Sequence, residues 1–170
     1  GTVGYNDGIG GIMDLNLRKG NNQHHEQTIQ AGLIGLDAAV EGPLSKNKRG
    51  SYLMNYRYST VGLLGLMGVS FGGEKITFQD FAMNIHLPGK QQKNAWSIYA
   101  VAGNSKNIFT KPDSATVYKE LSNIDFYSKT IITGISHTGY NSSNWSYKTG
   151  LSFSTQTNDR LQQQEKFESR

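Results

Sequence analysis

The stretch Thr77-Phe-Gln-Asp-Phe-Ala-Met-Asn-Ile-His-Leu87 decides the fold class. Large apolar side chains occupy every second position from Phe81 to Leu87, and polar or small side chains alternate with them. A β-strand points successive side chains to opposite faces, whereas a helix of 3.6 residues per turn would mix the two sets. The stretch therefore predicts a strand with one apolar face, formed by Phe81, Met83, Ile85 and Leu87, and one more polar face.

The same alternation recurs along the chain. Tyr52, Met54, Tyr56 and Tyr58 share one face of a predicted strand, and a later strand repeats the pattern with Trp145, Tyr147, Leu151 and Phe153. We predict seven strands, over residues 26–34, 37–44, 51–59, 77–87, 95–104, 130–140 and 145–159. An earlier strand is expected over residues 12–19, after the glycine-rich opening. The fold class is all-β, an antiparallel meander of about seven strands.

The connections between these strands differ in length. Short turns follow the second, fourth and sixth strands, and Gly35 with Leu36 offers a tight reversal after the first. We predict a long loop with helical character over Val61–Gly73, and a polar excursion over Ser105–Ser128 with a short helix near residues 114–121. Short turns at one rim and long loops at the other are typical of outer-membrane barrels, so Lys106–Ser128 is expected outside the cell.

Composition narrows the function classes. Apolar residues make up 36% of the chain, which also contains 20 glycines, nine tyrosines and only three prolines. This balance favours strands and turns over helices. Cysteine is absent, which excludes disulfides and thiolate zinc sites. The net charge of +4 is spread over separate turns rather than one stripe, so nucleic acid is not an expected partner.

Several stretches together carry a family resemblance. The segment Gly10-Gly-Ile-Met-Asp-Leu-Asn-Leu-Arg-Lys-Gly20 looks like the end of the plug domain of TonB-dependent outer-membrane receptors. The segments Gln30–Leu36, Glu41–Pro43 and Ser51–Ser59 resemble the first barrel strands of such receptors, especially the kind found in Bacteroidetes. The order and spacing of these stretches are more specific than any one of them.

The resemblance implies a receptor in the outer membrane of a Gram-negative bacterium that imports a nutrient ligand. Residues 1–20 would be the C-terminal end of the plug, 21–25 a linker, and 26–170 the first part of a 22-stranded transmembrane β-barrel. The implied partners are outer-membrane lipid, the TonB complex through a missing N-terminal part, and a surface lipoprotein. The chain would then be a piece of a longer protein, and in isolation it is expected to self-associate through its apolar face.

Candidate site residues lie on the polar face of the predicted strands. Side chains able to line a barrel lumen or contact a ligand are Arg57, Asp80, Asn84, His86 and Lys148. No catalytic set and no cofactor are expected, because the acidic residues are scattered. The glycine loop of residues 4–11 precedes a strand instead of a helix, which argues against a dinucleotide site. His24, His25 and Glu26 are interpreted as a solvated linker, since neighbours on an extended segment point apart.

Two other interpretations stay open from the sequence. A different envelope barrel, such as a porin or an usher, would share the alternation but would not need the plug-like segment at Gly10 and Gly11. A soluble β-sandwich that binds carbohydrate would place one face of each strand against a second sheet.

Overall fold

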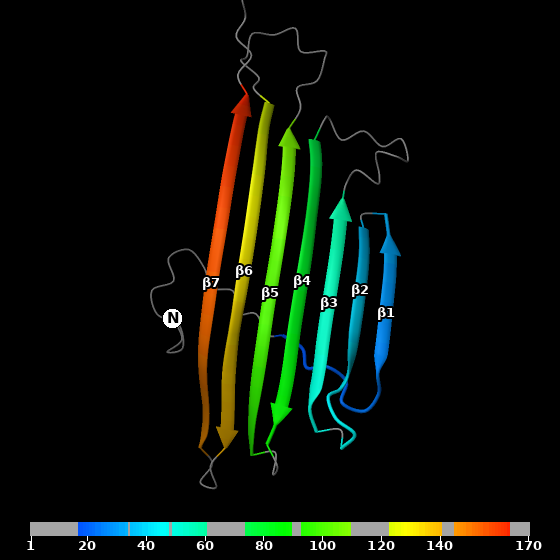
Figure 1. Cartoon of the computed structure of the whole chain (residues 1–170), viewed down its shortest axis with the longest axis vertical. Helices are drawn as coiled ribbons and strands as arrows, with labels where there is room; N and C mark the ends of the chain where they lie inside the picture. The colour runs from blue at the N-terminus through cyan, green and yellow to red at the C-terminus, as the bar shows by residue number, and fades with distance from the viewer. Residues whose placement is uncertain are drawn as a thin grey trace, which may run out of the picture.

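The computed structural model describes residues 17–33, 35–47, 49–60, 74–89, 93–109, 123–140 and 145–163. These residues form one open antiparallel sheet of seven strands in chain order (Figure 1). The strands are β1 (Glu26–Gly32), β2 (Gly35–Pro43), β3 (Ser51–Thr60), β4 (Glu74–Pro88), β5 (Asn94–Phe109), β6 (Asn123–Tyr140) and β7 (Ser146–Gln163). No helix occurs within the described ranges, and the predicted all-β meander is confirmed.

One face of the sheet carries rows of apolar side chains that continue from strand to strand. The register places Tyr52 opposite Ile85, and Ile85 opposite Ile98. Three neighbouring rows run across β3 to β7: Tyr52, Ile85, Ile98, Ile135, Leu151; Met54, Met83, Ala100, Thr133, Phe153; and Tyr56, Phe81, Ala102, Ile131, Thr155. We call these three rows the apolar band, and the face that bears them the apolar face.

The apolar band ends before the strands do. Towards the long connections the next row contains Tyr58, Gln79, Asn104, Lys129 and Thr157, and the row after it contains Thr77, Lys106, Tyr127 and Asp159. Towards the short turns, the Trp96 and His137 rings stack with centroids 4.3 Å apart, and Tyr147 lies 5.5 Å from His137. The band is therefore bounded by polar rows on one side and by an aromatic cluster on the other.

The opposite face, which we call the polar face, bears the intervening side chains. Glu41, Leu53, Asn84, Tyr99 and Ser152 follow one row across it. No hydrophobic side chain among the described residues is buried. A single sheet with both faces open has no core of its own, and a folded domain normally has two packed layers. Each face therefore needs a covering that the sheet itself does not supply.

The rims of the sheet follow the predicted alternation of long and short connections. At the short-turn rim, backbone hydrogen bonds join Leu44 to Gly50 (3.0 Å), Gly89 to Asn94 (2.9 Å) and Tyr140 to Lys93 (2.8 Å). The strands lengthen from 7 residues in β1 to 18 in β7, so the β7 side rises highest at the other rim (Figure 1). The tight reversal is earlier than predicted, because β1 ends at Gly32 and β2 begins at Gly35.

The predicted excursion over Ser105–Ser128 is wrong at both ends. β5 continues to Phe109 and β6 begins at Asn123, so Lys106 belongs to a strand and not to a loop. The reason is that Asn104 to Asn107 are polar on both faces, and an alternating pattern is lost there although the hydrogen-bond ladder continues. β4 and β7 also extend beyond their predicted ends, to Glu74 and Gln163. The helix predicted near 114–121 and the loop over 61–73 lie outside the described residues.

The strand predicted over residues 12–19 is not found in its described part. Leu17 to Lys19 have no strand partner in the sheet, and residues 12–16 lie outside the described ranges. Residues 17–25 instead cross behind β3 and β4 in Figure 1 and reach the start of β1. We call residues 17–21 the docked segment, because it lies against the polar face.

Candidate functional site

A polar site with two buried side chains lies where the docked segment meets the polar face. Glu41 is 8% exposed and Asn84 is 6% exposed, although the sheet around them is open. Both side chains lie in one cross-strand row, with Leu53 of β3 between them. Residues that approach from outside the sheet therefore account for their burial.

A bidentate ion pair joins the docked segment to β2. Arg18 Nη2 donates to Glu41 Oε1 at 2.6 Å, and Arg18 Nη1 donates to Glu41 Oε2 at 3.0 Å. The backbone N–H of Asn21 also donates to Glu41 Oε2, at 2.6 Å. The hydrogen bonds to Glu41 raise the pKa of the Arg18 guanidinium, which stays charged. Parallel bonds from a guanidinium to a carboxylate fix orientation as well as distance.

The backbone of the docked segment lies equally close to β3 and β4. Asn84 Nδ2 donates to the carbonyl oxygen of Arg18 at 3.0 Å. A Cβ atom at Gly20 would overlap the carbonyl oxygen of Tyr52, so a side chain does not fit there. Three neighbouring strands therefore hold the segment, through Glu41, Tyr52 and Asn84.

The structure brings two of the predicted site residues together. Arg57 and Asp80 are opposite each other on β3 and β4, and Arg57 donates to Asp80 Oδ2 from Nη2 (2.6 Å) and Nε (3.0 Å). The Arg57 guanidinium also lies 5.3 Å from the centroid of the Phe78 ring. Both charged side chains are well exposed, at 54% and 39%. Arg57 and Asp80 therefore bond to each other on the polar face, apart from the docked segment.

The other predicted site residues have separate surroundings. Asn84 contacts the docked segment, as described above. His86 Nδ1 lies 3.1 Å from the hydroxyl of Ser97 on β5. Lys148 lies on β7 opposite Thr138, three strands away from β4 and exposed. The five predicted residues share one face but do not form one site.

Three residues of this site, Arg18, Asn21 and Glu41, are not predicted by any pattern in the sequence. Arg18 and Glu41 are 23 positions apart and belong to different layers, so no period or spacing links them. The only signal in the sequence is indirect: Glu41 is an acidic side chain in a strand where the neighbouring positions are apolar or small.

The His24, His25 and Glu26 cluster does not converge on one point. The His25 ring turns towards the Tyr52 hydroxyl, at 3.2 Å, while Glu26 accepts a hydrogen bond from Asn21 Nδ2 at 2.6 Å. In the described parts of the chain, no group of three or more His, Asp or Glu side chains is placed to hold a metal ion.

The comparisons with known proteins return no match. No family model, no curated protein and no solved structure matches the chain. Within the described residues there is no helix long and apolar enough to cross a membrane.

Proposed function

We propose that this chain forms part of the wall of a transmembrane β-barrel, with the apolar face towards lipid and the polar face towards the lumen. The observation that carries the proposal is the limited height of the apolar band. Along β4 the band spans roughly 14 Å from Phe81 to Ile85, and roughly 20 Å when the bounding aromatic row at Leu87 is included, at ~3.4 Å per residue. Outer-membrane barrels carry an apolar band of about 25 Å between aromatic girdles, and their strands extend beyond it.

The slope of the apolar residues across the sheet also supports a barrel. In β1 the apolar side chains Ile29 and Ala31 lie level with Tyr56 and Tyr58, and in β2 they run from Leu36, level with Tyr58, to Val40, level with Met54. In β7 the corresponding side chains are Tyr147, Leu151 and Phe153, which lie level with Met54 and below it. From β1 to β7 the apolar side chains shift along the strands by about six residues, or roughly 20 Å. The shift occurs over six strand spacings of ~4.8 Å, so the strands would tilt by about 35° to the barrel axis. Barrel strands tilt by about 35–45° to the barrel axis.

The docked segment favours a plugged receptor over an open porin. The segment approaches the sheet from the polar face, which is the lumen side in this proposal, and its contacts with Glu41 and Asn84 are specific. We therefore propose a TonB-dependent receptor for a nutrient ligand in the outer membrane, in which these seven strands belong to a barrel of 22. A sandwich is less favoured, because its apolar face would not stop halfway along β5 and β6.

Spin labels in the full-length protein, reconstituted in lipid vesicles, test this proposal. Single cysteines are introduced at Met83, Asn84 and Gln79, and none has to be removed from these 170 residues, which lack cysteine. We expect a label at Met83 to collide mainly with dissolved oxygen, which concentrates in lipid, and labels at Asn84 and Gln79 to be shielded from lipid. Equal oxygen accessibility at Met83 and Asn84, or a lipid-exposed label at Gln79, would refute the proposal.

A further inference from the structure

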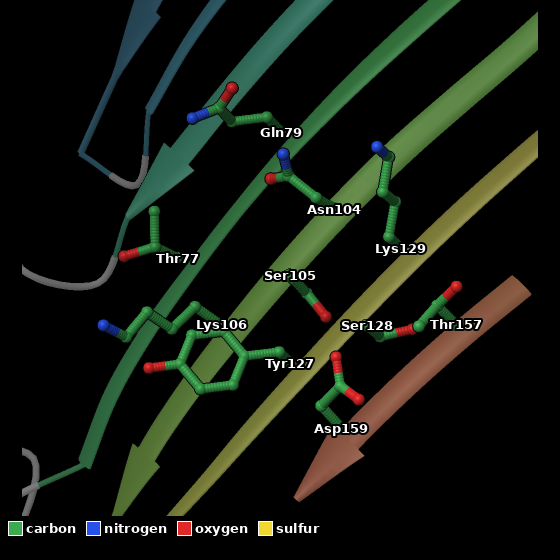
Figure 2. Close-up of a pocket in the computed structure, with 10 residues that line it drawn as sticks. All are labelled: Thr77, Gln79, Asn104, Ser105, Lys106, Tyr127, Ser128, Lys129, Thr157 and Asp159. Carbon is green, nitrogen blue, oxygen red and sulfur yellow. The ribbon is translucent and has the colours of Figure 1, made fainter.

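A shallow groove lies in the two polar rows beyond the apolar band. It has a volume of about 480 Å³ and runs across β4 to β7 on the apolar face. Figure 2 shows its residues, with the Lys106 side chain across the Tyr127 ring and Lys129 on the next row of β6. The Lys106 Nζ atom is 5.1 Å from the centroid of that ring. The groove therefore combines two ammonium groups with an aromatic side chain.

The groove offers more hydrogen-bonding groups than its own residues use. The Tyr56 hydroxyl donates to Gln79 Oε1 at 3.1 Å, and the Gln79 amide nitrogen is left as a donor. Among the described residues, the side chains of Asn104, Lys129 and Thr157 form no hydrogen bond or ion pair, although their backbones are neighbours in the sheet. Of the described residues that line the groove, two are lysines and only Asp159 is acidic. The groove thus carries a local excess of positive charge and free amide and hydroxyl groups.

The groove continues into the apolar band. A second hollow of about 170 Å³ shares Gln79, Asn104 and Lys129 with the first and is also lined by Tyr56, Phe81, Ala102 and Ile131. Ala102 lies between Phe81 and Ile131 in the same row, and its short side chain leaves the space between two larger ones. The combined surface is polar and cationic at one end and apolar at the other.

We infer that this groove binds an anionic glycolipid with two phosphates, one at Lys106 and the other at Lys129, and an acyl chain along Ala102. The ammonium groups supply charge-assisted hydrogen bonds to phosphate. The amides of Gln79 and Asn104 and the hydroxyl of Thr157 suit sugar hydroxyls, which a plain phospholipid headgroup offers in smaller number. The inference rests on the proposed function, which places the apolar band in lipid and the groove at the level of the outer headgroups.

Native mass spectrometry of the full-length protein in detergent tests the inference. The added lipids are a diphosphorylated glucosamine-disaccharide lipid, its dephosphorylated form, and phosphatidylglycerol. We expect one phosphorylated glycolipid to remain bound, with an affinity about tenfold higher than that of either other lipid. Substitution of both lysines, Lys106→Gln with Lys129→Gln, should abolish this preference, whereas Lys93→Gln at the short-turn rim should retain it. Ala102→Phe fills the apolar hollow and should weaken both glycolipids equally.

Three results would overturn the inference: an unchanged phosphate preference in the double lysine variant, equal binding of phosphatidylglycerol, or an equal effect of Lys93→Gln. A double variant with Lys106→Arg and Lys129→Arg, which keeps both charges, should retain the preference and guards against a general loss of folding. The spin label at Met83, measured on the same protein, separates the two proposals. A lipid-exposed label without glycolipid preference refutes only the groove, whereas a label shielded from lipid refutes the barrel.

Discussion

The two faces of the sheet differ in what covers them among the described residues. The polar face holds the docked segment through Glu41 and Asn84. The apolar face bears larger side chains, yet Leu151 is 75% exposed and Phe153 is 64% exposed. Soluble monomers rarely expose apolar patches beyond a few hundred Å². The difference teaches that each face suits its own surroundings, hydrogen-bonding protein on one side and an apolar medium on the other.

The largest effect is expected when the apolar face is placed in water. We predict that the isolated chain associates completely at micromolar concentration, through the side chains Tyr52, Met54, Phe81, Met83, Ile85, Leu151 and Phe153. Two sheets stacked about 10 Å apart would bury this face, and the open edges β1 and β7 invite strand exchange. Light scattering measures the mass. A stable monomer would contradict the prediction and would also weaken the barrel proposal.

An arginine placed on each face of β7, at two neighbouring positions, tests which face lies towards lipid. Phe153 and Ser154 are neighbours that point to opposite faces, and both are exposed. In the full-length protein, Phe153→Arg should lower the free energy of unfolding in lipid by about 2–4 kcal/mol, whereas Ser154→Arg should change it little, because lumen positions tolerate charge. Urea titration of the folded barrel, followed by gel mobility, gives both values. A cost for Ser154→Arg as large as that for Phe153→Arg would exchange the assigned faces.

The packing of the docked segment can be broken at Gly20. Gly20→Ala places a methyl group against the Tyr52 carbonyl, so the segment must move away from β3. Hydrogen exchange of residues 17–25 should then rise by about tenfold or more, because local opening exposes its amides. Gly150→Ala is the matched control: its added carbon meets Ile135 and Ser136 at ordinary distances of 3.5 and 3.6 Å. Equal exchange in the two variants would show that Gly20 does not fix the segment.

The smallest effect is expected for the charge of Glu41. Glu41→Gln keeps an acceptor but removes the ion pair with Arg18, whose side chain is 65% exposed, so water screens part of the loss. Exchange of residues 17–25 should rise several-fold, less than for Gly20→Ala. The Glu26 carboxylate accepts from the Asn21 side chain and acts on Arg18 only through its charge, so Glu26→Gln should leave the exchange of Arg18 and Gly20 near the original value. If Glu26→Gln raised the exchange as much as Glu41→Gln, the contacts of the linker, and not the Arg18–Glu41 ion pair, would hold the docked segment.

The sequence predicts the strands well where apolar and polar side chains alternate. Phe81 to Leu87 alternate because one face is apolar and the other polar, and β4 lies there as predicted. Beyond the band both faces are polar, as at Asn104 to Asn107, and the strand continues without a periodic signal. Loss of alternation therefore marked the end of the apolar band and was wrongly interpreted as the end of the strand.

The site was less predictable than the fold, for a different physical reason. Arg57, Asp80, Asn84, His86 and Lys148 were correctly assigned to one face by period two, but only Arg57 and Asp80 contact each other. The contacts that hold the docked segment join separate layers, from Arg18 to Glu41 and from Asn84 to the carbonyl oxygen of Arg18. Such contacts depend on where the chain crosses the sheet, which neither alternation nor turn length determines.

The unequal strand lengths have a consequence for the shape of the opening. β1 ends at Gly32, just above its apolar side chains, whereas β7 continues from Leu151 to Gln163, roughly 40 Å along the strand at ~3.4 Å per residue. In a membrane, the sheet would extend well beyond the lipid headgroups beside β7 but would end level with them beside β1. In the proposed barrel, the rim would therefore be lower on the β1 side than on the β7 side.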